Sequence, residues 1–174
     1  GADAISSVAP IYFKTTTDML FAHYSAIAGA TKLPFYTYHF MATGIPPIRE
    51  YVRRMLEVPN IAGMKVTDVN LLVIEQIVAY AQGKLHIFSG CDELNLSAVV
   101  AGADGAIGTF YNVFAPACIK AREAFLKGDI EAGKKFMIAF SKVVMEIVDD
   151  YNQTAPFFRQ SMQMLYGIDI GTGA

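Results

Sequence analysis

A lysine near the end of a short apolar run is the residue of this chain best suited to covalent chemistry. Lys65 lies in the run Ile61-Ala62-Gly63-Met64-Lys65-Val66. Burial removes water from an ammonium group, which lowers the pKa of the lysine and frees its amine to attack a carbonyl carbon. Lys65 is therefore a candidate Schiff-base nucleophile. The alternative is that Lys65 ends an edge strand and extends its ammonium outward into solvent.

A tyrosine occupies a similar position in another apolar run. Tyr38 lies near the end of Phe35-Tyr36-Thr37-Tyr38-His39-Phe40. A phenol held there can move protons or donate a hydrogen bond to a substrate carboxylate. The alternative is that Tyr38 only packs, as most tyrosines in strands do.

Carboxylates and glycines follow two further apolar runs. Ser89-Gly90-Cys91-Asp92-Glu93 could accept hydrogen bonds from the hydroxyl groups of a polyol. The alternative is that Asp92 caps the next helix and Glu93 lies in its first turn. The glycines of segment 105–112 permit a ligand anion to approach the backbone, or they only ease strand packing.

Composition excludes several classes of function. The histidines are in different segments without HxxxH spacing, and Cys91 and Cys118 form no CxxC pair, so we expect no metal site. A net charge of −2 without a basic stripe argues against nucleic-acid binding. Apolar runs end well before the roughly 18 residues that suggest a membrane span, and no signal peptide is present. These features predict a cytoplasmic protein.

The apolar pattern predicts short strands alternating with amphipathic helices, which is typical of an α/β fold with a parallel sheet. A doubly wound sheet is one alternative, although no GxGxxG turn follows any strand. A (β/α)8 barrel is the other; it places functional residues at the carboxyl ends of its strands and needs about 250 residues. The expected strands are 3–10, 35–40, 60–66, 85–89 and 104–110, and the last three expected helices are 115–127, 129–151 and 156–166.

The motifs around Tyr38, Lys65 and Asp92, with the segment Gly102-Ala103-Asp104-Gly105-Ala106-Ile107-Gly108-Thr109-Phe110-Tyr111-Asn112, resemble the N-acetylneuraminate lyase branch of the dihydrodipicolinate synthase superfamily. Their order and spacing match from Gly1 to about Gly167. The resemblance implies a (β/α)8 barrel with a C-terminal helical extension, usually assembled as a homotetramer. Residues 1–128 would then cover strands four to eight of the barrel, and residues 129–174 a truncated part of the extension.

The resemblance also implies roles for individual residues. Lys65 would be the Schiff-base lysine and Tyr38 the phenol beside it. Other positions would line the substrate pocket or reach into a neighbouring subunit. The pocket residues would be Thr67, Gly90, Asp92, Glu93 and Thr109, and the inter-subunit residue would be Tyr12.

The activity implied is that of a class I aldolase that cleaves N-acetylneuraminate to N-acetylmannosamine and pyruvate without metal or cofactor. Another pyruvate-dependent aldolase or dehydratase of the superfamily, such as a 2-keto-3-deoxy sugar acid aldolase, is the alternative. The synthases usually carry an arginine in the loop after the tyrosine. Met41-Ala42-Thr43 has none, and Asp92-Glu93 favours a polyol substrate.

Three departures from the family pattern bear on activity. The Gly-Ser/Thr-Thr-Gly-Glu loop, which binds the substrate carboxylate in the family, has no counterpart in this sequence, and we expect it upstream of Gly1. The loop from Tyr38 to Gly44 is shorter than usual and lacks its proline, and the sequence stops at Gly173-Ala174, inside the usual extension. A catalytically silent fragment, or a subunit that persists only in an assembly, is therefore a competing hypothesis.

Overall fold

The computed structural model describes residues 1–40 and 46–172. The predicted departures in the loop after Tyr38, at 41–44, and at Gly173-Ala174 lie outside the described residues.

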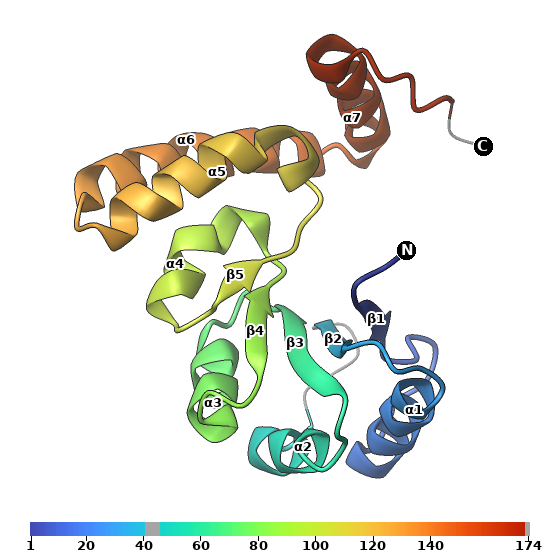
Figure 1. Ribbon diagram of the computed structural model, residues 1–174. Helices are drawn as coiled ribbons and strands as arrows, with labels where there is room; N and C mark the ends of the chain where they lie inside the picture. Colours follow the sequence, from blue (N-terminus) through green and yellow to red (C-terminus); the bar gives the residue numbers. More distant parts are fainter. Residues whose placement is uncertain (41–45, 173–174) are drawn as a thin grey trace. The chain divides into compact units, whose positions relative to one another are not determined.

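Five parallel strands form one sheet in the order in which they follow along the chain (Figure 1). A doubly wound sheet reverses its strand order at a switch point. The parallel strands connected by helices confirm the α/β class. No reversal occurs among the described strands, so the doubly wound alternative is wrong. Sequential order is also the order of neighbouring strands in a (β/α)8 barrel. The strands are β1 Ile5–Val8, β2 Phe35–Phe40, β3 Ile61–Thr67, β4 His86–Ser89 and β5 Gly105–Ala106.

Helices connect the strands, and three more follow β5. Thr16 accepts a hydrogen bond from Met19 N at 3.2 Å and caps α1, as the threonine cluster before this helix predicts. The helices are α1 Thr17–Gly29, α2 Ile48–Met55, α3 Leu72–Ala81, α4 Asn95–Val100, α5 Tyr111–Leu126, α6 Ile130–Val148 and α7 Tyr151–Tyr166, with a 3-10 turn η2 at Asp92–Leu94.

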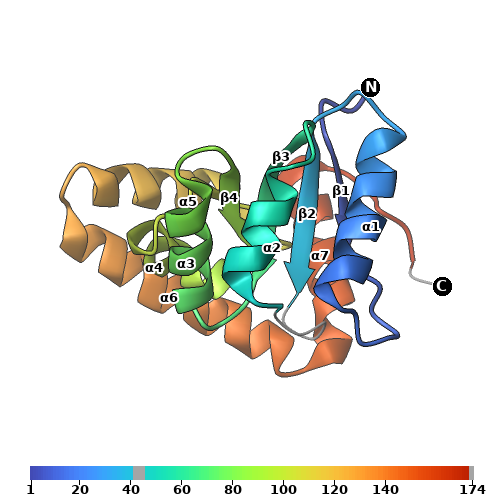
Figure 2. The same cartoon turned by 90° about the horizontal axis from the view of Figure 1, so that it is seen from below.

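Helices α1, α2 and α3 cover one face of the sheet (Figure 2). Their apolar stripes bury Leu20, Val52 and Ile74 against strand residues such as Phe35 and Met64. Right-handed crossovers in a sheet that does not reverse place every connecting helix on the same face. The other face of the sheet is therefore left to carry different side chains.

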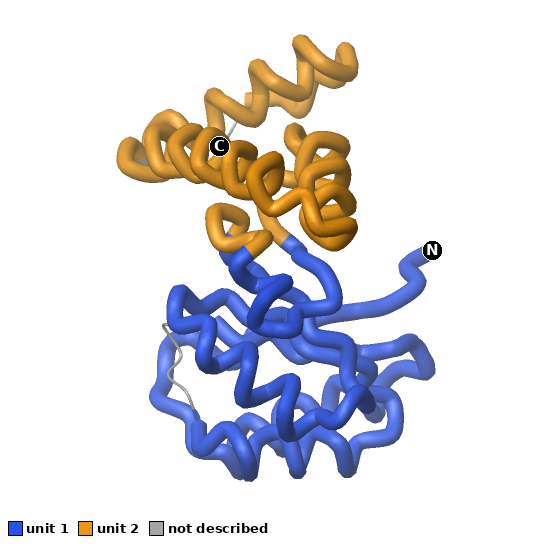
Figure 3. The backbone as a smooth tube through the Cα atoms, turned by 90° about the vertical axis from the view of Figure 1, so that its left-hand side faces the viewer, with its two compact units in different colours: residues 1–91, 97–107 blue, residues 92–96, 108–174 orange. Residues whose placement is uncertain are grey.

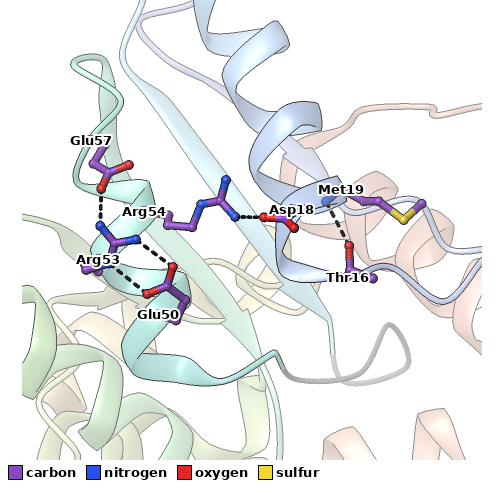
Figure 4. A network of polar contacts seen from close by, with 7 residues as sticks. All are labelled: Thr16, Asp18, Met19, Glu50, Arg53, Arg54 and Glu57. Carbon is purple, nitrogen blue, oxygen red and sulfur yellow. Dashed lines mark hydrogen bonds and ion pairs between the residues drawn. The ribbon is translucent and has the colours of Figure 1, made fainter.

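On the outer surface, an ion pair links α1 to α2 (Figure 4). Arg54 pairs with Asp18 and lies over the Phe21 ring, 4.2 Å from the ring centroid. Arg53 joins Glu50 within α2 and Glu57 just after the helix. Exposed pairs of this kind each contribute only about 0–1 kcal/mol, so the buried stripes provide most of the contact energy.

Two helices begin earlier than the sequence predicts. The expected ranges, 115–127 and 156–166, begin close to Pro116 and Pro156, and proline is favoured in the first turn of a helix. Instead α5 begins at Tyr111 and α7 at Tyr151, and both prolines lie beyond the first turn. A carboxylate sets each start: Asp92 accepts from Phe110 N at 2.8 Å, and Asp150 accepts from Asn152 N at 3.1 Å.

The fifth strand is much shorter than the predicted 104–110. Only Gly105–Ala106 pairs with β4. Ile107 N still donates to Ser89 O at 2.8 Å, after which the chain turns toward α5. This glycine-rich segment has few side chains to pack against a sheet, and its later backbone groups serve the start of α5.

The chain divides into two compact units (Figure 3). Unit 1 comprises residues 1–91 and 97–107 and holds the sheet; unit 2 comprises residues 92–96 and 108–174. The core of unit 2 is aromatic, with Phe110, Phe140, Cys118 and Val144 buried. Within the described residues, no helix combines the length and the apolar character needed to cross a bilayer.

Candidate active site

Strand register places the two predicted catalytic residues side by side in unit 1. Tyr38 pairs with Lys65 across β2 and β3, and Lys65 pairs with Phe88 across β3 and β4. Because side chains alternate along a strand, these three share one face of the sheet. Their strand neighbours, such as Thr37 and Val66, are buried on the helix-covered face. The half-buried face therefore carries the candidate chemistry.

Small residues make room for aromatic rings on this face. The Tyr36 and Phe88 rings lie 5.6 Å apart although a strand separates them. A Cβ atom on Gly63 of that strand would lie 2.7 Å from the Tyr36 ring, and one on Gly105 would lie 2.8 Å from the Phe88 ring. Both distances are too short, so glycine is required at both positions. Tyr36 pairs with Gly63, on the amino-terminal side of Lys65, and Phe88 pairs with Lys65 itself.

Lys65 lies over the Tyr38 ring, with Nζ 4.0 Å from the ring centroid. The Thr67 hydroxyl donates to the Tyr38 hydroxyl at 3.3 Å. Strand β3 lies between β2 and β4, so the alternative in which Lys65 ends an edge strand is wrong. Lys65 is half-buried, whereas each of the other lysines in the described residues is exposed.

Gly90 completes this group at the end of β4. Its N–H donates to Val66 O at 2.7 Å, which continues the pairing with β3. A Cβ atom on Gly90 would lie 1.9 Å from Thr67 Oγ1 and 2.9 Å from Lys65 Cε. The absence of a side chain thus leaves the space that the Lys65 and Thr67 side chains occupy. Unit 1 brings together four of the predicted site residues: Tyr38, Lys65, Thr67 and Gly90.

A buried pair behind these residues was not predicted. His39 Nε2 lies 3.5 Å from Asp68 Oδ2, and both side chains are buried. Burial lowers the pKa of His39, although the neighbouring Asp68 opposes this shift. Strand alternation could have indicated this pair. Tyr38 and Thr67 point to the site face, so the residues that follow them, His39 and Asp68, point to the helices.

Two buried tyrosines hold β2 from the helix side. Tyr24 of α1 donates to Tyr38 O at 3.2 Å, and Tyr51 of α2 donates to Thr37 Oγ1 at 3.3 Å. Burial raises the pKa of Tyr51 to about 12, so its hydroxyl keeps its proton at neutral pH. Burial also raises the pKa of Tyr24. The two hydrogen bonds thereby hold the carbonyl of Tyr38 and the side chain of the residue before it.

The remaining predicted pocket residues belong to unit 2. Asp92 is buried, and its Oδ2 accepts from Phe110 N at the start of α5. Glu93 is half-buried, and Thr109 is exposed with its carbonyl accepting from Asn112. Burial, with a further contribution from Asp92, raises the pKa of the Tyr111 phenol and raises that of the Cys118 thiol to about 11.

The other predictions about the site have simpler outcomes. Tyr12 lies after β1 and is 87% exposed, so it makes little contact within the chain. In the stretches 1–40 and 46–172, no three His, Cys, Asp or Glu side chains lie close enough together to hold a metal ion. The inter-subunit role of Tyr12 stays a prediction.

Known proteins match this chain in sequence. The sequence profile of the Dihydrodipicolinate synthetase family matches residues 1–171. A curated 4-hydroxy-tetrahydrodipicolinate synthase from Leptospira biflexa is 30% identical over 157 residues, which is 90% of this chain and 52% of the relative. The corresponding synthase from Archaeoglobus fulgidus is 36% identical over 137 residues, 78% of this chain and 47% of the relative. The chain therefore spans about half the length of these curated relatives.

Solved structures from both branches share the fold. Dihydrodipicolinate synthase from Bacillus anthracis matches with a TM-score of 0.89 at 26% identity, over 100% of this chain and 59% of the other. N-acetylneuraminate lyase from Aliivibrio salmonicida matches with a TM-score of 0.86 at 26% identity, over 98% of this chain and 57% of the other.

Proposed function

The chain belongs to the dihydrodipicolinate synthetase family, and we propose that it carries the Schiff-base lysine of a pyruvate-dependent class I aldolase. The observation that supports this most is the meeting of Lys65, Tyr38 and Thr67 at the carboxyl ends of neighbouring parallel strands. In (β/α)8 barrels, catalytic residues occupy that end. We assign the strands to barrel strands four to eight, residues 1–128 to the barrel, and residues 129–174 to the helical extension.

In this proposal the neutral Lys65 amine attacks the keto carbon of the substrate. Loss of water then gives an iminium, which draws electrons from the bond between C3 and C4 as that bond breaks. The C4 hydroxyl gives up its proton, and Tyr38 relays it with the substrate carboxylate to C3 of the enamine that cleavage leaves. Water then hydrolyses the resulting iminium, which releases pyruvate and restores the Lys65 amine. Thr67 orients the Tyr38 hydroxyl through the 3.3 Å hydrogen bond.

The contact between Lys65 and Tyr38 brings the reacting amine next to the proposed proton carrier. Nζ lies 4.0 Å from the centroid of the Tyr38 ring. A ring face attracts an ammonium by about 0.5–2 kcal/mol, and this attraction is absent for the uncharged amine that attacks the substrate.

For the substrate, we propose N-acetylneuraminate, cleaved to N-acetylmannosamine and pyruvate. Asp92 and Glu93 support a hydroxylated substrate, with Gly90 and Thr109 lining the pocket. The second candidate is the 4-hydroxy-tetrahydrodipicolinate synthase reaction, which the names of the curated relatives favour. Both candidate reactions share the imine at Lys65 and differ in the compound that is joined to pyruvate or released from it.

A direct substrate comparison tests this assignment. The whole protein that carries this chain is assayed for pyruvate release from N-acetylneuraminate and for the synthase reaction. Lyase activity without synthase activity is the expected result. Synthase activity alone would replace the substrate assignment and leave Lys65 in its role, whereas absence of any imine with pyruvate would overturn the aldolase proposal.

The remaining parts of the proposal concern assembly and place. We propose a cytoplasmic homotetramer in which Tyr12 reaches the site of a neighbouring subunit; its 87% exposure supports a role outside its own chain. Sedimentation of the whole protein with and without Tyr12→Ala measures this, and an unchanged assembly and activity would remove Tyr12 from the site.

A further inference from the structure

The segment that carries the two candidate recognition carboxylates is tied to the helices of unit 2. Residues 92–96 follow β4 directly, yet they group with residues 108–174 (Figure 3). We propose that Ser141 of α6 is a positioning residue that fixes Glu93 and thereby influences which substrate tail is accepted. This inference rests on the proposed function.

Three hydrogen bonds tie this segment to distant helices. Asp92 Oδ2 accepts from Phe110 N at 2.8 Å, and Asn95 Nδ2 donates to the Tyr111 hydroxyl at 2.9 Å; both lead to the start of α5. The third joins α6: Ser141 Oγ donates to Glu93 O at 2.9 Å. Glu93 thus depends on a residue far away in the sequence.

Asp92 and Glu93 have different surroundings. Asp92 is 5% exposed, and a Cβ atom on Gly108 would lie 1.4 Å from its Oδ1, so the carboxylate fills that space. The Asp92 carboxylate is committed to the start of α5. Glu93 is half-buried, and none of the hydrogen bonds found among the described residues uses its carboxylate. Glu93 is therefore the carboxylate left to meet a ligand, and its backbone decides where it points.

The position of Ser141 is itself fixed by packing. Its neighbour Phe140 is buried in the core of unit 2, stacked on Phe136 at 5.5 Å and edge-on to Phe114 at 5.5 Å. Removing the hydroxyl of Ser141 leaves these ring contacts in place. The substitution should release the backbone of Glu93 without disturbing the helix that carries Ser141.

The test uses three variants of the whole protein. Ser141→Ala removes the donor, and Ser141→Thr keeps a hydroxyl that can rescue it. Thr154→Val is the matched control, because the Thr154 hydroxyl also donates to a backbone carbonyl in unit 2, but that carbonyl is Ile147 O, at 3.4 Å, and not one in segment 92–96. The readouts are amide exchange in segment 92–96 and the ratio of kcat/KM for N-acetylneuraminate to that for a short 2-keto-3-deoxy acid.

Ser141→Ala is expected to speed amide exchange in segment 92–96 and to lower the selectivity ratio about 2- to 10-fold, as the loss of one ordinary hydrogen bond implies. Trapping of the pyruvate imine at Lys65 should persist. Ser141→Thr should restore both readouts, and Thr154→Val should change neither. Unchanged exchange, or faster exchange with an unchanged ratio, would overturn this inference. A wild-type protein that forms no imine would instead overturn the proposed function.

Discussion

Unit 1 and unit 2 hold their candidate site residues by different means. In unit 1, Tyr38 and Lys65 lie on paired strands, where a backbone ladder fixes their spacing and strand alternation fixes the face they share. In unit 2, Asp92 and Glu93 lie on a short 3-10 turn that contacts from α5 and α6 hold in place. A ladder of bonds is redundant, whereas the turn depends on single side chains.

This difference separates chemistry from recognition. The residues proposed for bond breaking stand on the most repetitive part of the fold, which tolerates the loss of any one contact. The residues proposed for substrate choice stand on a segment whose supports are few and distant in the sequence. We therefore expect substitutions in unit 1 to affect turnover and substitutions in unit 2 to affect selectivity or stability.

The largest expected effect of a substitution that tests the difference between the two units is the loss of kcat in Tyr38→Phe. The ring keeps its place under Lys65 while the hydroxyl that contacts Thr67 is lost. General acid–base groups contribute about 10²–10⁴-fold, so kcat should fall by that order while the fold is retained. Steady-state kinetics of the whole protein, with circular dichroism as the control for folding, measures this. An unchanged kcat would return Tyr38 to a packing role.

A smaller effect is expected in unit 2, where substitutions of the two carboxylates should change different properties of the protein. Glu93→Ala should raise KM for N-acetylneuraminate, because loss of a partner for a buried hydroxyl costs about 1–3 kcal/mol, or roughly 5- to 150-fold. Asp92→Ala should mainly lower stability, because it removes the acceptor for Phe110 N. Steady-state kinetics and urea unfolding of both variants distinguish the effect on KM from the effect on stability.

Two further outcomes decide between a structural role and a substrate-binding role for Asp92 and Glu93. If both variants lose stability with little change in substrate selectivity, the main role of the pair is structural and the N-acetylneuraminate assignment weakens. If cleavage shifts toward shorter 2-keto-3-deoxy acids while the imine at Lys65 persists, the pocket interpretation is supported.

The sequence predicted unit 1 better than unit 2 for the same physical reason. Apolar alternation marks β2 and β3 within a few residues, so the shared face of Tyr38 and Lys65 follows from local pattern alone. The starts of α5 and α7 were predicted too late, because the contacts of Asp92 and Asp150 that mark the true starts were not foreseen. The bond from Ser141 to Glu93 spans two distant segments, and no local signal indicates it.

The smallest expected effect concerns the buried pair behind the site in unit 1. Burial lowers the pKa of His39, so the folded state favours the neutral imidazole, while the unfolded state takes up a proton near pH 6.5. Stability attributable to His39 is thus present above about pH 6.5 and is lost as pH falls below that value toward the folded-state pKa. His39→Gln should remove this part of the acid sensitivity.

Urea unfolding at pH 7.5 and at pH 5.5 measures that loss. His86→Gln is the matched control, because His86 is an exposed histidine of the same unit. The control should keep the acid sensitivity of the wild type. If His39→Gln loses as much stability on acidification as the wild type, the buried pair does not set the pH response of unit 1.

The role of Lys65 is tested by trapping the pyruvate imine with borohydride and mapping the modified peptide by mass spectrometry. We expect a reduced pyruvyl adduct on Lys65, the half-buried lysine beside Tyr38, and its disappearance in Lys65→Ala. The exposed Lys84 and Lys32 serve as internal controls and should remain unmodified. An adduct on Lys84 or Lys32 in place of Lys65, or full activity after Lys65→Ala, would show that Lys65 is not the Schiff-base lysine.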